Sequence, residues 1–373
     1  MIVGVLKESP PETRVSLLPE AVSQLAKKNI QVLVESNAGA MASASDEDYL
    51  NAGAAIASQD DIIGKAQVIL AINLPQRIKD FNRGKVLIGV YQPLYQPQEV
   101  QVWGDTGLTI FSLDMLPRTT RAQSMDVLSS QANIAGYRAV LLASTLYPRY
   151  LPMFMTAAGS IAPAKVLILG AGVAGLQAIA TAKRLGAVVE VFDTRPAVKE
   201  EVMSLGAKFI EVEGAADASK AGGYAVEQTA DFQHKQQARI GESLTKADIV
   251  ITTAQIPGKK APVLITTDMV NKMRRGSVII DLAAATGGNT PFTENNKTVS
   301  VNGVQIVGNS LLPSTMPSDA SKLYGKNMQN FLALISTKEG ELQLNWSDDL
   351  VAGSCIVHEG EIKNERLRPT NNS

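Results

Sequence analysis

The sequence is poor in the residues that build disulfide frameworks and metal sites. Its 373 residues include one cysteine, Cys355, and two histidines, His234 and His358. A single cysteine excludes an internal disulfide framework and is typical of a protein of the reducing cytoplasm. The two histidines lie far apart and form no cluster with metal-ligand spacing, so we predict no metal site.

Membrane-spanning segments and blocks of like charge are also missing. The stretch from Val166 to Ala182 is uncharged, but it carries three glycines and is shorter than the ~20 apolar residues of a spanning helix. Residues 1–8 lack a basic region followed by a long apolar core, and therefore predict a first strand and no signal peptide. The formal net charge is −1 and the charged residues are interspersed. We expect no direct membrane insertion and no nucleic-acid partner.

A glycine-rich turn is the most informative feature present. The apolar run 166–169 predicts a parallel strand buried on both faces, and Gly170, Gly172 and Gly175 follow it as G-x-G-x-x-G. Residues 176–185 then predict a helix. The first glycine permits the tight turn, the second permits close approach of a pyrophosphate, and the third permits close packing of helix and strand. This combination predicts a dinucleotide site, with phosphates at the helix N-terminus.

A second predicted strand, 188–192, ends at Asp193, which lies 18 residues after Gly175. An acidic residue at about this spacing binds the ribose hydroxyls in dinucleotide-binding folds. Its carboxylate would repel a 2′-phosphate, so we expect NAD(H) and not NADP(H). The alternative is a glycine-rich turn in an ordinary α/β protein.

Strands alternate with helical patterns along the whole chain, which predicts an α/β protein with two doubly wound, Rossmann-like domains and mainly parallel sheets. Because a helical pattern at 320–335 remains after the second domain, we predict that the first domain is discontinuous. The predicted domains are 1–136 plus 314–373, and 137–313. Further predicted strands are 2–6, 31–35, 67–72, 85–90, 108–113, 208–212, 249–253, 278–282 and 305–307, with helices at 19–28 and 122–144.

Residues 213–243 form a long connection that carries Gly222-Gly223 before Tyr224, and 225–240 predict a polar helix within it. Such a connection beside a ligand site can be a lid. An idle surface insertion remains the alternative.

A dense polar segment, 117–131, follows the predicted strand 108–113 and so lies at a carboxyl end of the sheet, where open α/β sheets bind ligands. Its amide, guanidinium, carboxylate and hydroxyl groups can orient a carboxamide and phosphates. The alternative is a helix cap with a solvated face. The candidate residues are Arg118, Thr119, Thr120, Arg121, Gln123, Asp126 and Ser129.

A general base for oxidation of a hydroxy or amino acid is not evident. Such a reaction removes a proton as well as a hydride, and histidine is the usual base. Neither histidine follows a predicted strand, whereas hydride transfer between two nicotinamides needs no base. Gln123 with Ser129 suits that reaction.

These features are similar to the NAD(H)-binding component, the first domain of the alpha subunit, of proton-translocating NAD(P) transhydrogenases. Alanine dehydrogenase is a more distant resemblance, through residues 12–15. The matching segments extend over nearly the whole chain: 117–126, 135–140, 172–187, 221–224, 256–265 and 276–283.

The resemblance implies roles for individual residues. Arg118, Gln123, Asp126 and Ser129 would act at the nicotinamide end. The implied NAD(H) contacts are Thr119, Thr120, Arg121, Gly170, Gly172, Val173, Gly175, Asp193, Thr194, Arg195, Gly223, Tyr224, Gln236 and Gln255. Gln255 departs from the family pattern, which has an apolar residue there.

The resemblance also implies a homodimer that works with a separate NADP(H)-binding component and with membrane-spanning transhydrogenase subunits at the cytoplasmic face of the inner membrane. We expect those membrane parts to be separate chains. One alternative is an alanine-type amino-acid dehydrogenase, whose Lys, His and Asp are replaced here by Asn73, Gln92 and Ala285. The other is a non-catalytic NAD(H)-sensing subunit.

Overall fold

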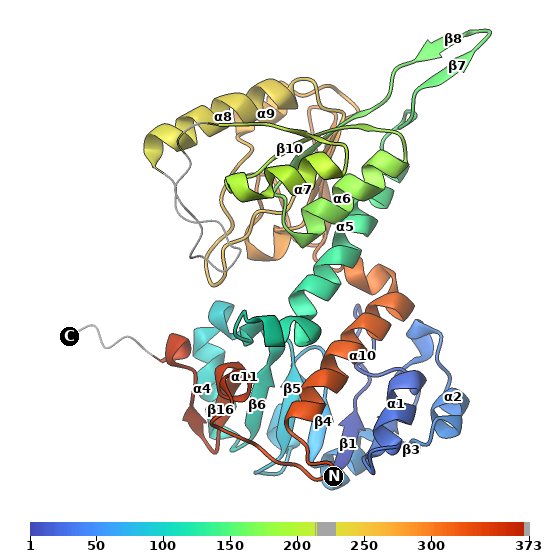
Figure 1. The fold of residues 1–373 in the computed structure, drawn as a ribbon, viewed down its shortest axis with the longest axis vertical. Helices are drawn as coiled ribbons and strands as arrows, with labels where there is room; N and C mark the ends of the chain where they lie inside the picture. The colour runs from blue at the N-terminus through green and yellow to red at the C-terminus, as the bar shows by residue number, and fades with distance from the viewer. Residues whose placement is uncertain (213, 215–228, 369–373) are drawn as a thin grey trace. The chain divides into compact units, whose positions relative to one another are not determined.

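The computed structural model describes residues 1–212, 214 and 229–368, which form two compact units (Figure 1). The first unit comprises Met1–Gln131 and Ser314–Ser373, and the second comprises Ala132–Pro313. The division falls inside helix α5 (Val127–Leu146), at Gln131 instead of residue 136. Both units are α/β structures with mainly parallel sheets, as the sequence predicts.

The first unit contains an eight-stranded sheet in the order β17-β16-β6-β5-β4-β1-β2-β3. Neighbouring strands from β3 to β6 run parallel, and β16 and β17 add an antiparallel edge. Its parallel part follows the order 3-2-1-4-5-6 of dinucleotide-binding folds. The strands are β1 (Ile2–Val5), β2 (Gln31–Glu35), β3 (Ala55–Ala57), β4 (Val68–Leu70), β5 (Val86–Gly89), β6 (Thr109–Ser112), β16 (Cys355–His358) and β17 (Glu361–Ile362).

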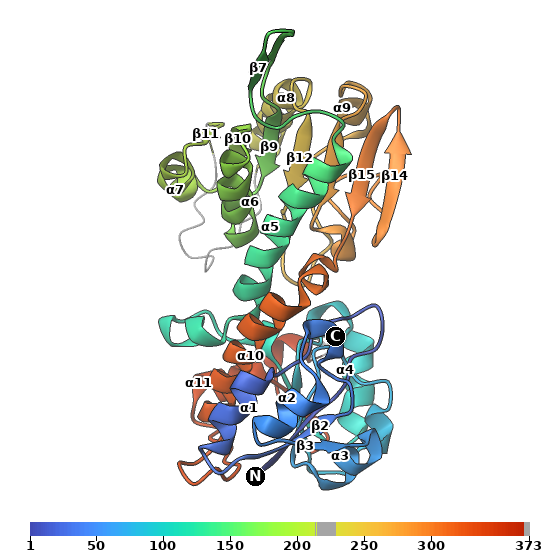
Figure 2. The same ribbon diagram turned by 90° about the vertical axis from the view of Figure 1, so that its right-hand side faces the viewer.

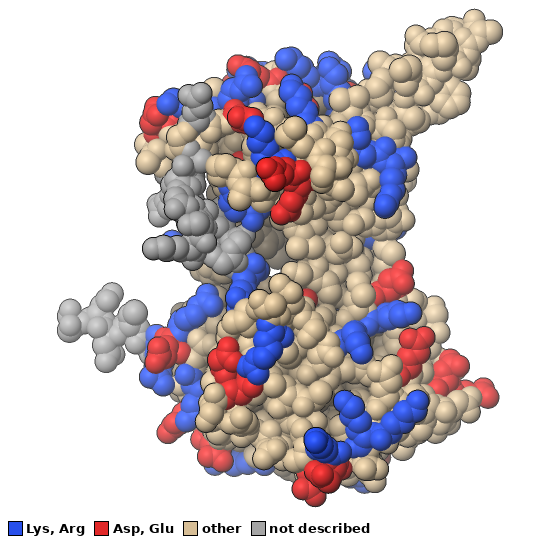
Figure 3. Space-filling view, in the orientation of Figure 1, with Lys and Arg blue, Asp and Glu red and all other residues tan. Residues whose placement is uncertain are grey.

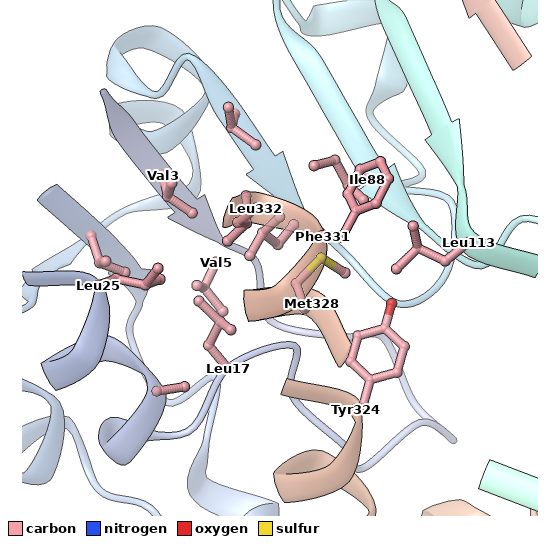
Figure 4. Close-up of a cluster of buried hydrophobic side chains, with 14 of the residues drawn as sticks. Val3, Val5, Leu17, Leu25, Ile88, Leu113, Tyr324, Met328, Phe331 and Leu332 are labelled. Atoms are coloured by element: carbon pink, nitrogen blue, oxygen red, sulfur yellow. The ribbon is translucent and has the colours of Figure 1, made fainter. Parts of the chain in front are cut away.

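Helices cover both faces of this sheet. Alternate strand residues face opposite sides, so Val3 and Ile88 contribute to one core while Ile69 and Leu87 contribute to the other. Figure 4 shows that α10 inserts Tyr324, Met328, Phe331 and Leu332 into the first of these cores. The helices are α1 (Pro19–Ala26), α2 (Asp46–Asn51), α3 (Gln59–Lys65), α4 (Pro97–Asp105), α10 (Pro317–Leu334) and α11 (Asp349–Ser354).

The second unit repeats this strand order. Its sheet runs β11-β10-β9-β12-β13-β15-β14 and is parallel except for the edge strand β14. The strand order therefore reverses between β9 and β12, which is where such folds bind ligands at the carboxyl ends of the strands. The strands are β9 (Lys165–Leu169), β10 (Val188–Phe192), β11 (Lys208–Phe209), β12 (Ile249–Thr252), β13 (Val278–Asp281), β14 (Lys297–Val301) and β15 (Val304–Gly308).

Two helical layers enclose the second sheet (Figure 2). Val166 and Ile168 of β9 pack with α5, α6 (Val173–Arg184) and α7 (Lys199–Ser204). Leu167 and Leu169 pack on the other face with α8 (Ala230–Leu244) and α9 (Thr267–Asn271). The apolar run of β9 is thus buried on both faces, as the sequence predicts.

A two-stranded hairpin, β7 (Phe154–Thr156) and β8 (Gly159–Ile161), extends away from the body of the second unit (Figures 1 and 2). Residues 150–164 contain no charged side chain, and Figure 3 shows the hairpin without blue or red atoms. Met153, Phe154 and Met155 are exposed on it.

Some sequence predictions need correction. The predicted helix 122–144 is interrupted, because residues 120–125 form a 3-10 helix and α5 begins only at Val127. The polar helix predicted at 225–240 is α8, which spans Ala230–Leu244. Strands β3, β14, β16 and β17 and the hairpin were not predicted from the sequence.

Lys and Arg side chains alternate with Asp and Glu over the visible surface of each unit (Figure 3), so neither shows a field of one sign there. No helix within residues 1–212, 214 and 229–368 has the length and apolarity to span a membrane. Across that same part of the chain, no group of three or more His, Cys, Asp or Glu side chains is arranged to hold a metal.

Candidate NAD(H) and hydride-transfer site

The three glycines of the β9–α6 turn have the geometry that their spacing predicts. Gly170 has φ +105°, and a Cβ there would lie 2.3 Å from Oγ1 of Thr253. At Gly175 a Cβ would lie 1.9 Å from the carbonyl oxygen of Gly170, so only glycine permits this close packing. A Cβ at Gly172 would meet nothing within 4 Å. The space above Gly172 is therefore open to a ligand.

The N-terminus of α6 lies at this turn. Gly172 is its N-cap residue, and no side chain caps the helix. Free N–H groups and the positive end of the helix dipole make such a terminus a good site for phosphate. Val173, the first helical residue, is 41% exposed. The turn thus fits the pyrophosphate of a dinucleotide.

Asp193 follows β10 and binds the glycine turn. Its Oδ2 accepts a hydrogen bond from the backbone N–H of Ala171 at 2.7 Å. Arg195 donates to Oδ1 from Nε at 2.9 Å and to Oδ2 from Nη2 at 2.8 Å. The hydrogen bond with Asp193 raises the pKa of Arg195. Asp193 is 9% exposed, so its carboxylate is almost enclosed by these partners.

The neighbouring strand ends complete this edge of the sheet. Thr253, after β12, donates to the carbonyl oxygen of Gly170 at 3.1 Å. Gln255 donates through Nε2 to the carbonyl oxygen of Leu282 at 2.9 Å. Asn289, which was not predicted from the sequence, is fully buried and holds this segment by donating to the carbonyl oxygen of Ala254 at 2.9 Å.

The remaining predicted contacts of the second unit are placed as follows. Thr194 is half-buried, and Gln236 is buried on α8. Gly223 and Tyr224 lie outside the described residues. The structure thus brings together, at one edge of the second sheet, Gly170, Gly172, Val173, Gly175, Asp193, Thr194, Arg195 and Gln255.

The polar segment of the first unit follows β6. Arg118, Thr119 and Thr120 are exposed. Arg121 forms a bidentate ion pair with Asp348, at 2.6 and 2.7 Å, and also contacts Asp349. This pairing lowers the pKa of Asp348. Arg121 therefore holds the segment against the start of α11 in this structure.

Asp126 caps α5. Its Oδ1 accepts from the backbone N–H of Ser129 at 2.9 Å, and its Oδ2 accepts from the Ser129 hydroxyl at 2.6 Å. In this structure the contacts of Asp126 and Ser129 are therefore those of a helix N-cap, the alternative interpretation of this segment. The segment nevertheless presents Gln123, whose side chain is exposed and makes no hydrogen bond within the described structure.

A buried ionic cluster lies where β1 and β4 end, and it was not predicted from the sequence. Arg14 donates to Glu12 from Nη2 at 2.6 Å and to Oε1 of Gln131 from Nη1 at 2.8 Å. Asn73 donates to Glu8 at 3.0 Å. The hydroxyl of Tyr324 is buried and has no partner among the described atoms. The sequence signal that could have indicated it is Glu12 two residues before Arg14, in the turn that follows the predicted strand 2–6.

The carboxyl groups of Glu8 and Glu12 are both buried, but their pKa values shift in opposite directions because only Glu12 is paired with Arg14. Burial raises the pKa of Glu8 to about 7, because its effect exceeds the lowering by the hydrogen bonds from Asn73 and Ile72. Burial would also raise the pKa of Glu12, but the hydrogen bonds and charge of Arg14 outweigh it and hold this pKa at about 2. Arg14 therefore forms a stable ion pair with the ionised Glu12 carboxylate.

Neither histidine lies at the carboxyl end of a parallel strand, where open α/β sheets bind ligands. His234 is exposed on α8. His358 is on β16 and hydrogen-bonds through Nδ1 to Thr109 at 2.8 Å, at the amino end of β6.

Comparisons with known proteins agree with this geometry. Residues 4–135 match the family model "Alanine dehydrogenase/PNT, N-terminal domain", and residues 139–365 match "Alanine dehydrogenase/PNT, C-terminal domain".

Individual relatives identify a group within this family to which the chain is closely similar in sequence and structure. An NAD(P) transhydrogenase alpha subunit chain of Rhodospirillum rubrum is 45% identical over 98% of this chain and 99% of its own. The crystal structure of transhydrogenase from Sinorhizobium meliloti has a TM-score of 0.89 at 44% identity and covers 97% of this chain and 100% of its own.

Alanine dehydrogenase of Bacillus subtilis is 28% identical over 77% of this chain and 72% of its own. The relation to the dehydrogenase is thus the more distant one. The chain belongs to the alanine dehydrogenase/PNT family, and within it to the group of the NAD(P) transhydrogenase alpha subunits.

Proposed function

We propose that this chain is the NAD(H)-binding component of a proton-translocating NAD(P) transhydrogenase. The turn after β9 carries the proposal: Gly172 leaves open space, α6 is uncapped, and the Asp193 carboxylate adjoins the turn. NADH bound here supplies a hydride to NADP⁺ on a separate NADP(H)-binding component. Because no proton need be abstracted in that transfer, it requires no histidine at the carboxyl end of a parallel strand, and neither histidine lies there.

The second unit supplies the binding groups. The backbone of Gly170, Gly172, Val173 and Gly175, with the N–H groups of α6, would hold the pyrophosphate. Asp193, with Thr194 and Arg195, would bind the adenosine ribose and reject a 2′-phosphate, which supports NAD(H) over NADP(H). Gly223, Tyr224, Gln236 and Gln255 remain further proposed contacts.

The segment after β6 in the first unit would orient the nicotinamide, through Arg118, Thr119, Thr120 and Gln123. Asp126 and Ser129 would keep the start of α5 in place, as their mutual hydrogen bonds suggest. Arg121 would act through its pair with Asp348, which restrains the segment.

The proposed assembly is a homodimer that works with membrane-spanning subunits at the cytoplasmic face of the inner membrane. The exposed apolar hairpin supports a role in dimer contact, since exposed clusters of large apolar side chains mark interaction sites. A hollow of about 600 Å³ at its base is lined by Tyr147, Pro148, Arg149, Tyr150 and Ile161. This hollow shares no residue with the glycine turn.

The proposal is tested by measuring hydride transfer before and after the chain is mixed with an NADP(H)-binding component. We expect the isolated chain to bind NADH, detected by nucleotide fluorescence, and to transfer no hydride alone. Addition of an NADP(H)-binding component should start the transfer, because the two rings must approach to about 3.5 Å.

Two results would contradict the proposal. NADH oxidation by the chain alone, with pyruvate and ammonia, would establish an amino-acid dehydrogenase. NADH binding without transfer after mixing would establish a sensing subunit.

A further inference from the structure

Two asparagine side chains of α10 converge on one backbone carbonyl of the segment after β6. Asn327 donates from Nδ2 to the carbonyl oxygen of Ser124 at 2.9 Å, and Asn330 donates to the same oxygen at 2.8 Å. Residues three apart lie on the same face of a helix, so α10 presents both amides together. A carbonyl oxygen has two lone pairs, and both are used here. These two hydrogen bonds form an asparagine tether between α10 and the segment.

The position of this carbonyl is informative. Ser124 directly follows Gln123, the exposed amide proposed to act at the nicotinamide. On either side of these two residues, Ala122 and Met125 are buried, at 4% and 5% exposure. The polar pair Gln123-Ser124 is therefore held between two buried anchors and is additionally bound to α10.

The helix that carries the asparagine tether is firmly packed. Met328 and Phe331, the residues directly after each asparagine, are fully buried in the core of the first unit (Figure 4). Displacement of α10 would disturb that core, so the two amides are fixed in position. Functional groups supported from packed helices are held more accurately than groups on free loops.

The stability of the folded state does not by itself explain an asparagine at position 327. It is 7% exposed, and its Oδ1 has no hydrogen-bond partner among the described atoms. A buried acceptor without a partner destabilises the folded state, whereas an apolar side chain of similar size would avoid that loss. The hydrogen bond to Ser124 is the contact that an apolar residue could not make.

We propose that Asn327 and Asn330 are positioning residues for hydride transfer, which fix the Ser124 carbonyl and thereby the place of Gln123. The proposal rests on the proposed function, in which Gln123 acts at the nicotinamide. Neither asparagine need touch the nucleotide.

The experiment compares Asn327→Leu, Asn330→Ala and the double variant with the wild type and with Lys326→Ala. Lys326 is an exposed α10 residue next to Asn327 and makes no contact with the segment among the described hydrogen bonds and ion pairs, so it is the matched control. Four quantities are measured: the NADH dissociation constant, the transfer rate at saturating NADP(H) component, the thermal midpoint, and trypsin cleavage after Arg118 and Arg121.

We expect each single variant to keep one hydrogen bond of the tether and lose transfer about 3-fold, and the double variant to lose about 30-fold or more, because small misplacements at a reacting centre are costly. The NADH dissociation constant should change less than about 2-fold, since the pyrophosphate and ribose contacts lie elsewhere. Asn327→Leu should not lower the thermal midpoint, and Lys326→Ala should match the wild type. Trypsin should cleave the double variant faster.

Three results would overturn the proposal. Wild-type transfer in the double variant would make the tether irrelevant. A parallel loss of NADH affinity, or a loss of transfer that follows the thermal midpoint, would show a general structural role. If the wild type itself transfers no hydride after mixing, the proposed function fails, and trypsin cleavage decides the tether separately: an unchanged rate in the double variant refutes it.

Discussion

Two glycines of the turn between β9 and α6 have different roles, one in packing and one in ligand binding. Gly175 lies so close to the backbone of Gly170 that a methyl group cannot be placed there, whereas Gly172 has open space and ordinary dihedral angles of φ −77° and ψ −169°. The same G-x-G-x-x-G pattern therefore contains one residue required by packing and one left free for a ligand.

Alanine substitutions separate these two roles. Gly175→Ala should lower the free energy of unfolding by about 2–4 kcal/mol, because it forces the turn apart. Gly172→Ala should leave stability unchanged but weaken NADH binding about 10-fold or more, because its methyl group occupies the space above the turn. Thermal unfolding and NADH titration of both variants check this pair. Equal NADH affinity of Gly172→Ala and the wild type would contradict a pyrophosphate at this position.

A second prediction at the residue scale concerns the ion pair between Asp193 and Arg195. Asp193→Ala removes a charged acceptor near the proposed ribose and leaves the Arg195 guanidinium beside it. NADH binding should weaken about 10-fold to 100-fold, and NADPH binding should strengthen, since an arginine here accommodates a 2′-phosphate. Competitive titrations give the ratio, with Glu190→Gln on the same strand as a control. An unaltered ratio would mean that the ribose is recognised elsewhere.

At the scale of strands and helices, the ends of β1 and β4 meet at the point where the first sheet reverses its order, and Glu8 and Asn73 lie there. The groups around the Glu8 carboxyl are Asn73, the N–H of Ile72, Glu12, Arg14, Tyr91 and Tyr324. The raised pKa of Glu8, about 7 against an ordinary 4.5, links the stability of this unit to pH.

The sign of this linkage follows from the raised pKa. Below 4.5 Glu8 is protonated in both states; between 4.5 and 7 the unfolded chain ionises first, so stability falls as the pH rises. The loss should total about 3 kcal/mol. Glu12, with its pKa lowered from 4.5 to about 2, contributes stability that is lost as the pH falls from about 4.5 through 2, which is below this range.

Tryptophan fluorescence can follow this unit alone, because the two tryptophans of the chain, Trp103 and Trp346, both lie in it. Urea unfolding at about pH 5 and about pH 8 should show that Glu8→Gln removes most of the difference seen in the wild type. The exposed Glu47→Gln should preserve it. Identical pH dependence of Glu8→Gln and the wild type would refute the assignment.

Local patterns explain which elements the sequence predicts. The β9–α6 unit depends on periodicity and glycine spacing within a few residues, and the structure confirms it. Strand β16 pairs with β6, so that Cys355 lies opposite Phe111, and such distant pairing has no local pattern. The asparagine tether was missed for the same reason: helical spacing places Asn327 and Asn330 on one face, but their acceptor is more than 200 residues away.

At the scale of the whole molecule, the alternation of predicted strands and helices along the chain predicts two α/β domains, and the structure confirms this fold class. The hairpin β7–β8 was not predicted, because three-residue strands without burial leave no alternation to recognise. Its exposed apolar side chains are the basis for the proposed contact with a second copy of the chain.

Replacing Phe154 and Met155 together by serine should shift the proposed homodimer toward monomer without lowering the thermal midpoint, since both side chains are exposed. Size-exclusion chromatography with light scattering measures the change. Met41→Ser, at an exposed methionine of the first unit, should leave the mass of the assembly unchanged. A dimer that survives the double substitution would remove the hairpin from the interface.

The repeated strand order has a consequence for stoichiometry. Both sheets have the topology of a nucleotide-binding fold, but the turn after β1, residues 6–14, contains no glycine. There, Oε1 of Glu12 accepts from Thr13, Arg14 and Ser314, and this buried carboxylate would repel a phosphate. The turn therefore gives a pyrophosphate no close approach to the backbone. Equilibrium titration should saturate at one equivalent of NADH per chain, despite two copies of the topology.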